Sequence, residues 1–219
     1  METPLQRLQQ HLATLAEGQQ FWIGLVGAPG SGKSTLAAWL QQQLGAALLV
    51  IPMDGYHLSR QQLDQLADPE QAYARRGAPF TFDAERCVAE LQQARLCKQG
   101  WFPGFDHADG DPVAACYRLE PHHRLVLVEG NYLLLQDAPW DRLAATVFDE
   151  TWLLDIPLTV SNQRVWQRHC QLGLSAGQAQ QRVDDNDGLN AALILQQSRS
   201  RANIRWPQVL IDDLLAGAR

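Results

Sequence analysis

Short, almost uninterrupted apolar runs alternate with longer polar segments along most of this chain. The runs predict β-strands at Phe21–Val26, Ala47–Pro52, Leu125–Val128, Trp152–Asp155 and Val209–Ile211. Apolar residues fill consecutive positions instead of every second one, as in strands that are covered on both faces. The pattern therefore favours a buried, parallel sheet.

Most of the segments between these runs have the spacing and composition of polar helices. They include Lys33–Leu44, Ala84–Leu96 and Val160–Gln171, and leucines 5, 8, 12 and 15 form one apolar stripe near the start. Alternation of strand and helix is typical of an α/β fold in which right-handed crossovers join parallel strands.

The interval between the second and third predicted strands departs from this alternation. It contains a helix, a loop at Arg75–Asp83 and an aromatic, glycine-containing segment at Trp101–Tyr117, which we expect to be a second long loop. Long loops inside a compact α/β domain are usually functional. With no internal repeat and no linker, residues 1–219 are expected to form a single domain.

The composition of the chain limits the classes of binding partner and the compartment that we expect. Apolar residues make up 46% of the 219 residues, the net charge is −6 and no dense basic run occurs, so we expect no nucleic-acid polymer as partner. No apolar run reaches membrane-spanning length. The cysteines (Cys87, Cys97, Cys116 and Cys170) are scattered and are expected to be buried, unpaired thiols of a cytoplasmic protein.

One motif indicates the chemistry. Residues 27–34 read G-A-P-G-S-G-K-S, which matches G-x-x-x-x-G-K-[ST] between a predicted strand and a predicted helix. Glycines let backbone N–H groups surround phosphate oxygens, Lys33 neutralises the β- and γ-phosphates, and the Ser34 hydroxyl binds Mg²⁺. The expected ATP-binding residues are Gly27, Ala28, Pro29, Gly30, Ser31, Gly32, Lys33, Ser34 and Thr35.

Phosphate loops occur in several protein classes. The N-K-x-D motif of GTPases is absent from this sequence. Leu174–Gln178 resembles the L-S-G-G-Q signature of transporter ATPases, and the apolar-then-acidic run Val209–Asp213 follows it. However, the interval between the two is too long for that family, and we interpret Ser175 as a helix N-cap instead.

Acidic residues end three of the predicted strands, where ligands of open parallel sheets bind. Asp54 can accept the proton of an attacking hydroxyl, although an Asx-turn would also suit an Asp at this position. Glu129 closes an apolar strand in the Walker-B pattern and is the predicted second Mg²⁺ residue, unless it merely faces solvent. Asp155 is the third.

Several further segments carry a family resemblance. Met53–His57 (MDGYH), Arg76–Pro79 (RGAP) with Phe82-Asp83, Phe105–His107 (FDH) and Glu129–Tyr132 (EGNY) follow the phosphate loop in order. Together they resemble the pantothenate kinase, uridine kinase and phosphoribulokinase group, most closely its nucleoside/nucleotide kinase-like or fructose-transport kinase-like branch. The resemblance implies a three-layer P-loop fold with a parallel five-stranded sheet of order 2-3-1-4-5 and a lid.

The resemblance also implies residue roles. Asp54 is the general base, and Arg164 and Arg168 on the lid close over the phosphates, although such an i, i+4 pair could equally be a solvated helix face. The substrate pocket is expected from the segments at 75–83 and 105–111. Its candidate residues are Asp54, Tyr56, His57, Arg76, Phe105, Asp106 and His107. Trp101 is a further candidate for the pocket wall.

The acceptor is less well defined. The segment at 105–111 (FDHADGD) is acidic and matches neither uridine kinases nor pantothenate kinases, and its carboxylates suit a polyol or ribose-bearing substrate. We therefore expect Mg²⁺–ATP-dependent phosphorylation of a sugar, nucleoside or pantothenate-like metabolite; the alternative is a regulatory ATPase without an acceptor. Asp184–Asn190 is expected to be a polar loop after the lid. The sequence is compatible with a homodimer but does not require one.

Overall fold

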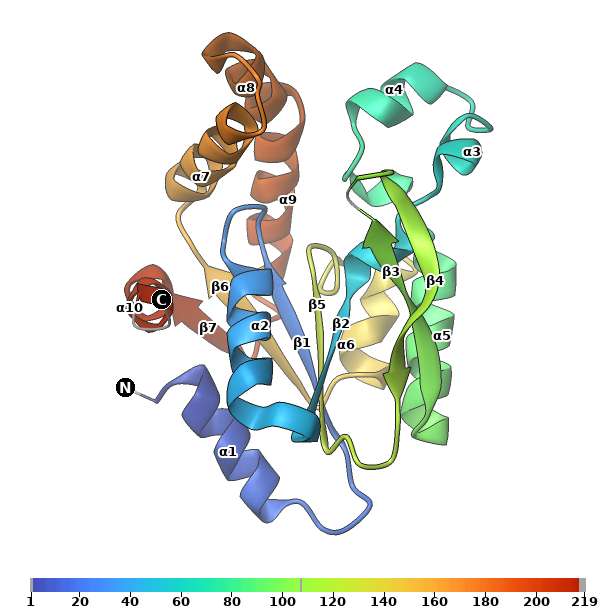
Figure 1. Ribbon diagram of the computed structural model, residues 1–219, viewed down its shortest axis with the longest axis vertical. Helices are drawn as coiled ribbons and strands as arrows, with labels where there is room; N and C mark the ends of the chain where they lie inside the picture. Colours follow the sequence, from blue (N-terminus) through green and yellow to red (C-terminus); the bar gives the residue numbers. More distant parts are fainter. Residues whose placement is uncertain (1, 107, 217–219) are drawn as a thin grey trace.

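A sheet of parallel strands forms the centre of the protein, in the order β2-β5-β1-β6-β7 (Figure 1). The computed structural model describes residues 2–106 and 108–216. The strands are β1 (Phe21–Gly27), β2 (Leu48–Pro52), β5 (Leu125–Gly130), β6 (Glu150–Asp155) and β7 (Ile204–Pro207). Counted along the chain within this sheet, the order is 2-3-1-4-5, which confirms the predicted topology.

Helices cover both faces of this sheet and complete three layers (Figure 1). The helices of the described chain, including those beyond the strand ends, are α1 (Pro4–Thr14), α2 (Lys33–Leu44), α3 (Arg60–Leu63), α4 (Pro69–Ala74), α5 (Ala84–Cys97), α6 (Leu143–Thr146), α7 (Leu158–Gln171), α8 (Ala176–Arg182), α9 (Gly188–Ser198) and α10 (Gln208–Ala216). Short helical turns are η1 (Gly45–Ala47), η2 (Met53–Tyr56), η3 (Pro79–Thr81), η4 (Trp140–Arg142) and the π-helical η5 (Val183–Asp187).

Successive side chains of each strand enter two separate apolar cores. On β1, Trp22 packs in the core under α5, α6 and α9, whereas the next residue, Ile23, packs in the core under α1, α2 and α10. Because adjacent side chains of a strand point to opposite faces, both cores need apolar residues from the same strand. This double burial explains the continuous apolar runs of the sequence.

The segment expected as a second long loop is instead a two-stranded antiparallel hairpin of β3 (Gly100–Asp106) and β4 (Asp111–Leu119). It packs on η2 so closely that a Cβ on Gly55 would lie 2.2 Å from the carbonyl oxygen of Pro103. Glycine at this position is therefore needed for the contact between η2 and β3. The prediction of a loop was wrong because glycines and prolines interrupt the segment and the hairpin's outer strand is largely exposed.

The fifth strand was also misplaced. Residues 209–211 lie inside α10, and the edge strand is β7, four residues long. An edge strand has only one paired neighbour, and β7 buries Trp206 alone. Its mixed sequence therefore gave no apolar run, while the apolar residues 209–211 belong to a helix.

Helices α7, α8 and α9, together with η5, form the lid. The lid rises beyond the carboxyl ends of the strands, opposite α3 and α4 (Figure 1). Ser175 caps α8 through a capping box with Gln178, which confirms the interpretation of the L-S-G-G-Q-like segment. The predicted polar loop at Asp184–Asn190 is helical instead: η5 continues directly into α9.

The cysteines only partly match their prediction. All four are free thiols, but Cys87 alone is buried, while Cys97 and Cys116 are exposed and Cys170 is intermediate. Burial in the core raises the pKa of the Cys87 thiol. In the part of the chain that the structure describes, every helix is too short or too polar to cross a bilayer.

Candidate active site

The phosphate loop joins β1 to the first turn of α2. Gly30 and Gly32 have φ angles of +78° and +93°, a conformation that glycine adopts without steric cost. A Cβ on Gly30 would lie 2.7 Å from the Ser161 carbonyl oxygen, so a larger residue would push the loop away from α7. The loop thereby presents the N-terminus of a twelve-residue helix, which favours an anion.

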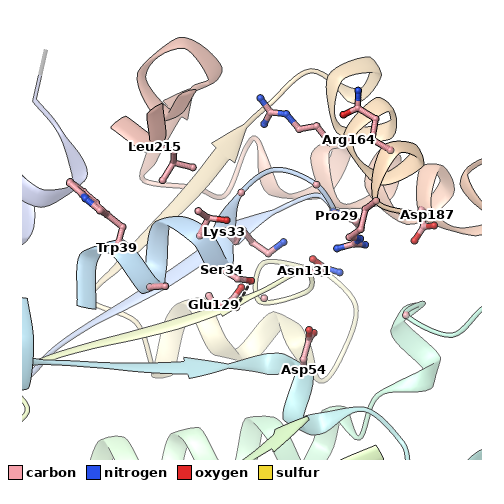
Figure 2. Close-up of a pocket in the computed structure, with 18 of the residues that line it drawn as sticks. Pro29, Lys33, Ser34, Trp39, Asp54, Glu129, Asn131, Arg164, Asp187 and Leu215 are labelled. Carbon is pink, nitrogen blue, oxygen red and sulfur yellow. Dashed lines mark hydrogen bonds between the residues drawn. The ribbon is translucent and has the colours of Figure 1, made fainter. Parts of the chain in front are cut away.

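Lys33, Ser34 and Glu129 meet at the base of this loop (Figure 2). The Lys33 ammonium donates to the carbonyl oxygens of Gly27 and Ala28, at 2.8 and 3.3 Å. The Ser34 hydroxyl donates to Glu129 Oε1 at 2.8 Å. Ser34 lies in the first turn of α2 and Glu129 is the second-last residue of β5, so the register of β5 against β1 sets this contact.

Burial perturbs both charged groups. It lowers the pKa of Lys33, with Arg168 adding to the effect, while the carboxylates of Glu129 and Asp54 oppose it. Burial likewise raises the pKa of Glu129, against the influence of Lys33 and the Ser34 hydroxyl. Charges that lack water in this way are stabilised when a ligand of complementary charge arrives.

The donor set of Ser34 and Glu129 fits a magnesium ion. Mg²⁺ prefers oxygen ligands and retains several waters, so proteins usually supply only one or two oxygens beside the substrate's phosphates. A hydroxyl and a carboxylate in contact at the phosphate loop satisfy this requirement. The described residues offer no group of three His, Cys, Asp or Glu side chains that would form a complete protein cage.

Asp54 lies on η2, which directly follows β2, and His57 is the residue after this turn. Both line the cavity, and Figure 2 shows Asp54 pointing into it from the side opposite Lys33. His57 Nδ1 lies 2.8 Å from the Asp54 carbonyl oxygen, and its ring packs on Phe82 and Phe105 at centroid distances of 3.9 and 4.7 Å. The short η2 turn is thus fixed by the ring contacts of His57.

A single large cavity unites these groups. Its volume is about 1170 Å³, and it extends from the phosphate loop to η2 and beneath the lid. From the sequence candidates it contains Asp54, His57, Lys33, Ser34, Glu129, Arg164 and Arg168, together with Pro29, Gly30, Gly32 and Thr35 of the phosphate loop.

Other sequence candidates lie elsewhere. Tyr56 is buried in the core and donates its hydroxyl to Glu90 at 2.9 Å, so it faces α5 instead of the cavity. Arg76 lies 3.7 Å from Asp111 and stacks over Phe105, and neither Arg76 nor Phe105 lines the cavity. The short sequence motifs that contain these residues did not show which of their side chains face the cavity.

The acidic hairpin turn is engaged in its own structure. Asp106 Oδ1 accepts the backbone N–H of Ala108 at 2.7 Å, and Asp111 Oδ1 accepts that of Arg60, also at 2.7 Å. His107 lies outside the described residues. Trp101 is exposed beneath the Arg118 guanidinium at the far end of the hairpin and does not line the cavity.

The two lid arginines and Asp155 have different ionic partners. Arg164 forms a 2.6 Å ion pair with Asp212 of α10, whereas Arg168 has no acidic partner among the described residues. Both line the cavity. Asp155 binds Arg199 at 2.9 Å and is absent from the cavity wall, so this strand end serves an ion pair.

Sequence reasoning missed several cavity residues. Asn131 follows the Walker-B strand, and Asp187 stands in η5, where its Oδ2 lies 2.8 Å from His169 Nε2. Trp39 and Leu215 line the outer end of the cavity, on α2 and α10 (Figure 2). Asp187 and Asn190 lie close together because residues 183–198 are helical. The polar sequence at the start of this segment did not predict a helix.

The fold and site define a class of protein. A phosphate loop follows the central parallel strand, Glu129 lies near the carboxyl end of β5, Asp54 follows β2, and the helical lid contributes to the wall of the same cavity. This arrangement is that of a P-loop phosphotransferase.

Comparison with known proteins gives the family. No protein-family model matches the chain. A Schizosaccharomyces pombe protein, provisionally named a uridine kinase, is 37% identical over 209 residues, which cover 91% of this chain and 86% of that protein. A crystal structure from Silicibacter sp. TM1040, provisionally named a fructose transport system kinase, is 34% identical with a TM-score of 0.82, over 94% of this chain and 100% of that one.

A third comparison supports the fold. Saccharomyces cerevisiae YFH7, provisionally described as a P-loop kinase with a circular permutation, has a TM-score of 0.79 at 22% identity, over 93% of this chain and 97% of that one. The chain belongs to the P-loop kinases that contain this uridine kinase-like protein. It is an ATP-dependent small-molecule kinase.

Proposed function

We propose that this kinase transfers the γ-phosphoryl group of Mg²⁺–ATP to a hydroxyl of a small, uncharged polyhydroxyl metabolite. The observation that carries the proposal is the position of Asp54. It faces the Lys33, Ser34 and Glu129 cluster across one cavity (Figure 2). A carboxylate opposite a phosphate site is placed to receive the proton of an attacking hydroxyl.

On the phosphate side, each group has a separate task. The backbone of the phosphate loop and the α2 N-terminus hold the β- and γ-phosphates, and Lys33 moves from its carbonyl partners toward their oxygens. Ser34 and Glu129 would hold Mg²⁺, which supplies charge neutralisation between the β- and γ-phosphates. Arg168 adds a second positive charge from the lid.

On the acceptor side, Asp54 takes the hydroxyl proton as the oxygen forms a bond to the γ-phosphorus. The bond between that phosphorus and the β–γ bridging oxygen breaks, and ADP leaves with the bond's electrons. The proton then passes from Asp54 to solvent after the product leaves. We assign the exclusion of water from this step to the lid, whose residues Arg164 and Arg168 form part of the cavity wall.

The charge of the cavity wall supports an uncharged acceptor. Among the described residues, its lysine and arginine side chains are Lys33, Arg164 and Arg168, and each lies on the phosphate loop side or the lid. Toward η2 the wall offers instead Asp54 and His57, and Asn131, which follows β5, adds an amide group. Carboxylate and amide oxygens accept hydrogen bonds from hydroxyls but repel an anionic group.

The acidic hairpin turn has a smaller part in this proposal than the sequence indicated. Its Asp106 and Asp111 already accept backbone N–H groups. Recognition of a sugar-like acceptor is therefore assigned to Asp54, which lines the cavity.

A substrate panel tests this assignment. Purified protein with Mg²⁺–ATP is given free sugars, polyols and ribonucleosides, each beside its phosphorylated or carboxylated counterpart, and ADP release is recorded. We expect stimulation by an uncharged member and at least tenfold less by its anionic counterpart. Phosphorylation of pantothenate, a carboxylate, but of no sugar, polyol or nucleoside would overturn the proposed acceptor class.

A further inference from the structure

A set of hydrogen bonds joins the loop at 74–77, on the acceptor side, to the lid. Arg75 donates from Nε to Asn186 Oδ1 and from Nη2 to Asn190 Oδ1, both at 3.1 Å. In return, Asn186 Nδ2 donates to the Arg76 carbonyl oxygen at 3.0 Å. Arg182 donates to the carbonyl oxygens of Ala74 and Arg76 at 2.7 and 3.3 Å. We call this set the clasp.

The clasp depends on Arg75 because its amide partners are buried. Asn186 and Asn190 are 1% and 3% exposed, and Asn190 Nδ2 donates to Asn186 Oδ1 at 3.1 Å. Buried amide oxygens require donors, and the planar guanidinium fork of Arg75 reaches both oxygens at once. A side chain with a single ammonium group would reach only one of them.

From the clasp, contacts continue toward the phosphate side. Asp187 follows Asn186 in η5 and holds His169 of α7 at 2.8 Å, and His169 is the residue after Arg168. The π-helical turn packs tightly here, since a Cβ on Gly188 would lie 2.9 Å from the Val183 carbonyl oxygen. The turn of α7 that carries Arg168 is therefore fixed through η5.

At its other end the loop is fixed to the sheet. The Tyr132 hydroxyl donates to the Gly77 carbonyl oxygen, and Gly77 lines the cavity. Burial raises the pKa of Tyr132, so this hydroxyl stays protonated and remains a donor. Loop 74–77 thus has a fixed position relative to β5 and, through Arg75, to the lid.

We propose that Arg75 is a positioning residue for phosphoryl transfer: through the clasp it holds the lid in the position that places Arg168 over the phosphates. Arg75 itself touches neither phosphate nor acceptor in this account. The inference rests on the proposed role of Arg168, because Arg75 acts only through it.

Kinetics of the slow, acceptor-independent hydrolysis of Mg²⁺–ATP test the inference without knowledge of the acceptor. Arg75→Met keeps the length of the side chain but removes both donors. We expect kcat to fall about tenfold, with the KM for ATP changed less than about twofold, because misplacement of a charge affects the transition state more than ground-state binding. Arg142→Met, which removes an exposed arginine that pairs with Glu85 and lies outside both the cavity wall and the clasp, is the matched control and should leave both constants unchanged.

The double variant separates positioning from general stability. If Arg75 acts through Arg168, Arg75→Met should lower kcat no further in an Arg168→Met background. Multiplicative effects, or a wild-type kcat in Arg75→Met, would overturn the inference while leaving the proposed function intact. A normal kcat in Arg168→Met would instead overturn the phosphate role of Arg168 and, with it, the inference about Arg75.

Folding of Arg75→Met is checked by circular dichroism and by its affinity for ADP. Should that variant fail to fold, Arg75→Lys is measured in its place, since it retains the charge but has one donor nitrogen in place of the guanidinium fork. An intermediate fall of kcat, about threefold, is then expected, again absent in the Arg168→Met background. Full wild-type kcat in Arg75→Lys would contradict the requirement for two donors.

Discussion

At the scale of single residues, the site keeps two charged groups away from water. Lys33 and Glu129 are each only 8% exposed. Lys33 is compensated by backbone carbonyl oxygens and Glu129 by the Ser34 hydroxyl, yet burial still disfavours both charged forms. Buried charges of this kind lower the stability of the unliganded protein and strengthen the binding of a ligand of complementary charge.

Replacement of Glu129 should therefore separate stability from activity. Its pKa is raised in the folded protein, so the folded state gains stability from the protonated carboxyl at low pH and loses that stability as pH rises through the raised value. At pH 7 we expect Glu129→Gln to be more stable than the wild type by on the order of 1 kcal/mol, with the difference shrinking toward pH 4.

Urea unfolding at the two pH values measures this difference, and ATP turnover with Mg²⁺ should fall by about 100-fold or more in the same variant. Glu85→Gln, on the exposed face of α5, is the control and should change neither quantity. Loss of stability at pH 7 in Glu129→Gln would show that the carboxylate is needed to hold Lys33 in place.

The two lid arginines, which the sequence treats alike, should behave differently. Arg168 lines the cavity without an acidic partner among the described residues, whereas Arg164 is bound to Asp212. We expect Arg168→Met to lower kcat by about 100-fold or more, and Arg164→Met to lower it less than tenfold. Steady-state ADP release measures both, and equal losses in the two variants would contradict the distinction.

Sequence predicted the parts of the site that are contiguous. The phosphate loop, Asp54 and Glu129 each lie in a short motif at the end of an apolar run that predicts a strand. The structure brings all three to one cavity. Arg75 and Asn190 are 115 positions apart, and their contact depends on how the lid folds over the sheet. Tyr56 was misassigned because the sequence of a short turn does not say which side chains face inward.

At the scale of elements, α1 is held on the sheet by a buried carboxylate. Arg7 donates from Nε to Glu150 Oε1 at 2.8 Å and from its fork to Oε2, and the Trp152 indole also donates to Glu150. Burial alone would raise the pKa of Glu150, but these donors lower it below its usual value.

Arg7→Met should lower the free energy of unfolding by about 2 to 3 kcal/mol at pH 7, because it leaves a largely buried carboxylate with fewer donors. A depressed carboxyl pKa contributes stability above its unfolded value, near 4.5, that is lost as pH falls through the folded value. The difference between variant and wild type should therefore shrink below about pH 4.5.

Urea denaturation at both pH values measures this difference. Arg142→Met, which breaks only an exposed pair with Glu85, should cost less than about 0.5 kcal/mol. A difference for Arg7→Met that does not change with pH would refute the electrostatic explanation.

Elements with buried strands were predicted well, and partly exposed elements were not. Interior strands of the sheet are apolar on both faces, so their positions follow from the sequence alone. The edge strand β7 and the hairpin of β3 and β4 are only partly buried, and their mixed sequences give no such signal. The secondary structure of residues 209–211 depended on tertiary packing, because a short apolar run is compatible with either a strand or a helix.

At the scale of the whole molecule, the order of the strands places the chemistry. The central β1 has β5 on one side and β6 on the other, and the chain crosses from one half of the sheet to the other at this point. Ligand sites of open parallel sheets form at such a switch, at the carboxyl ends of the strands. Both cores share this one sheet, and we propose that the chain acts as a single domain.

The most direct test of this account is ADP release from Mg²⁺–ATP by the wild type and by Asp54→Asn, with and without the panel of uncharged hydroxyl compounds. We predict that one compound stimulates ADP release in the wild type. In Asp54→Asn this stimulation should fall by at least about 100-fold, while ADP affinity remains unchanged. A steady rate that is indifferent to every compound and to the substitution would contradict the role of Asp54 and would indicate an ATPase without an acceptor.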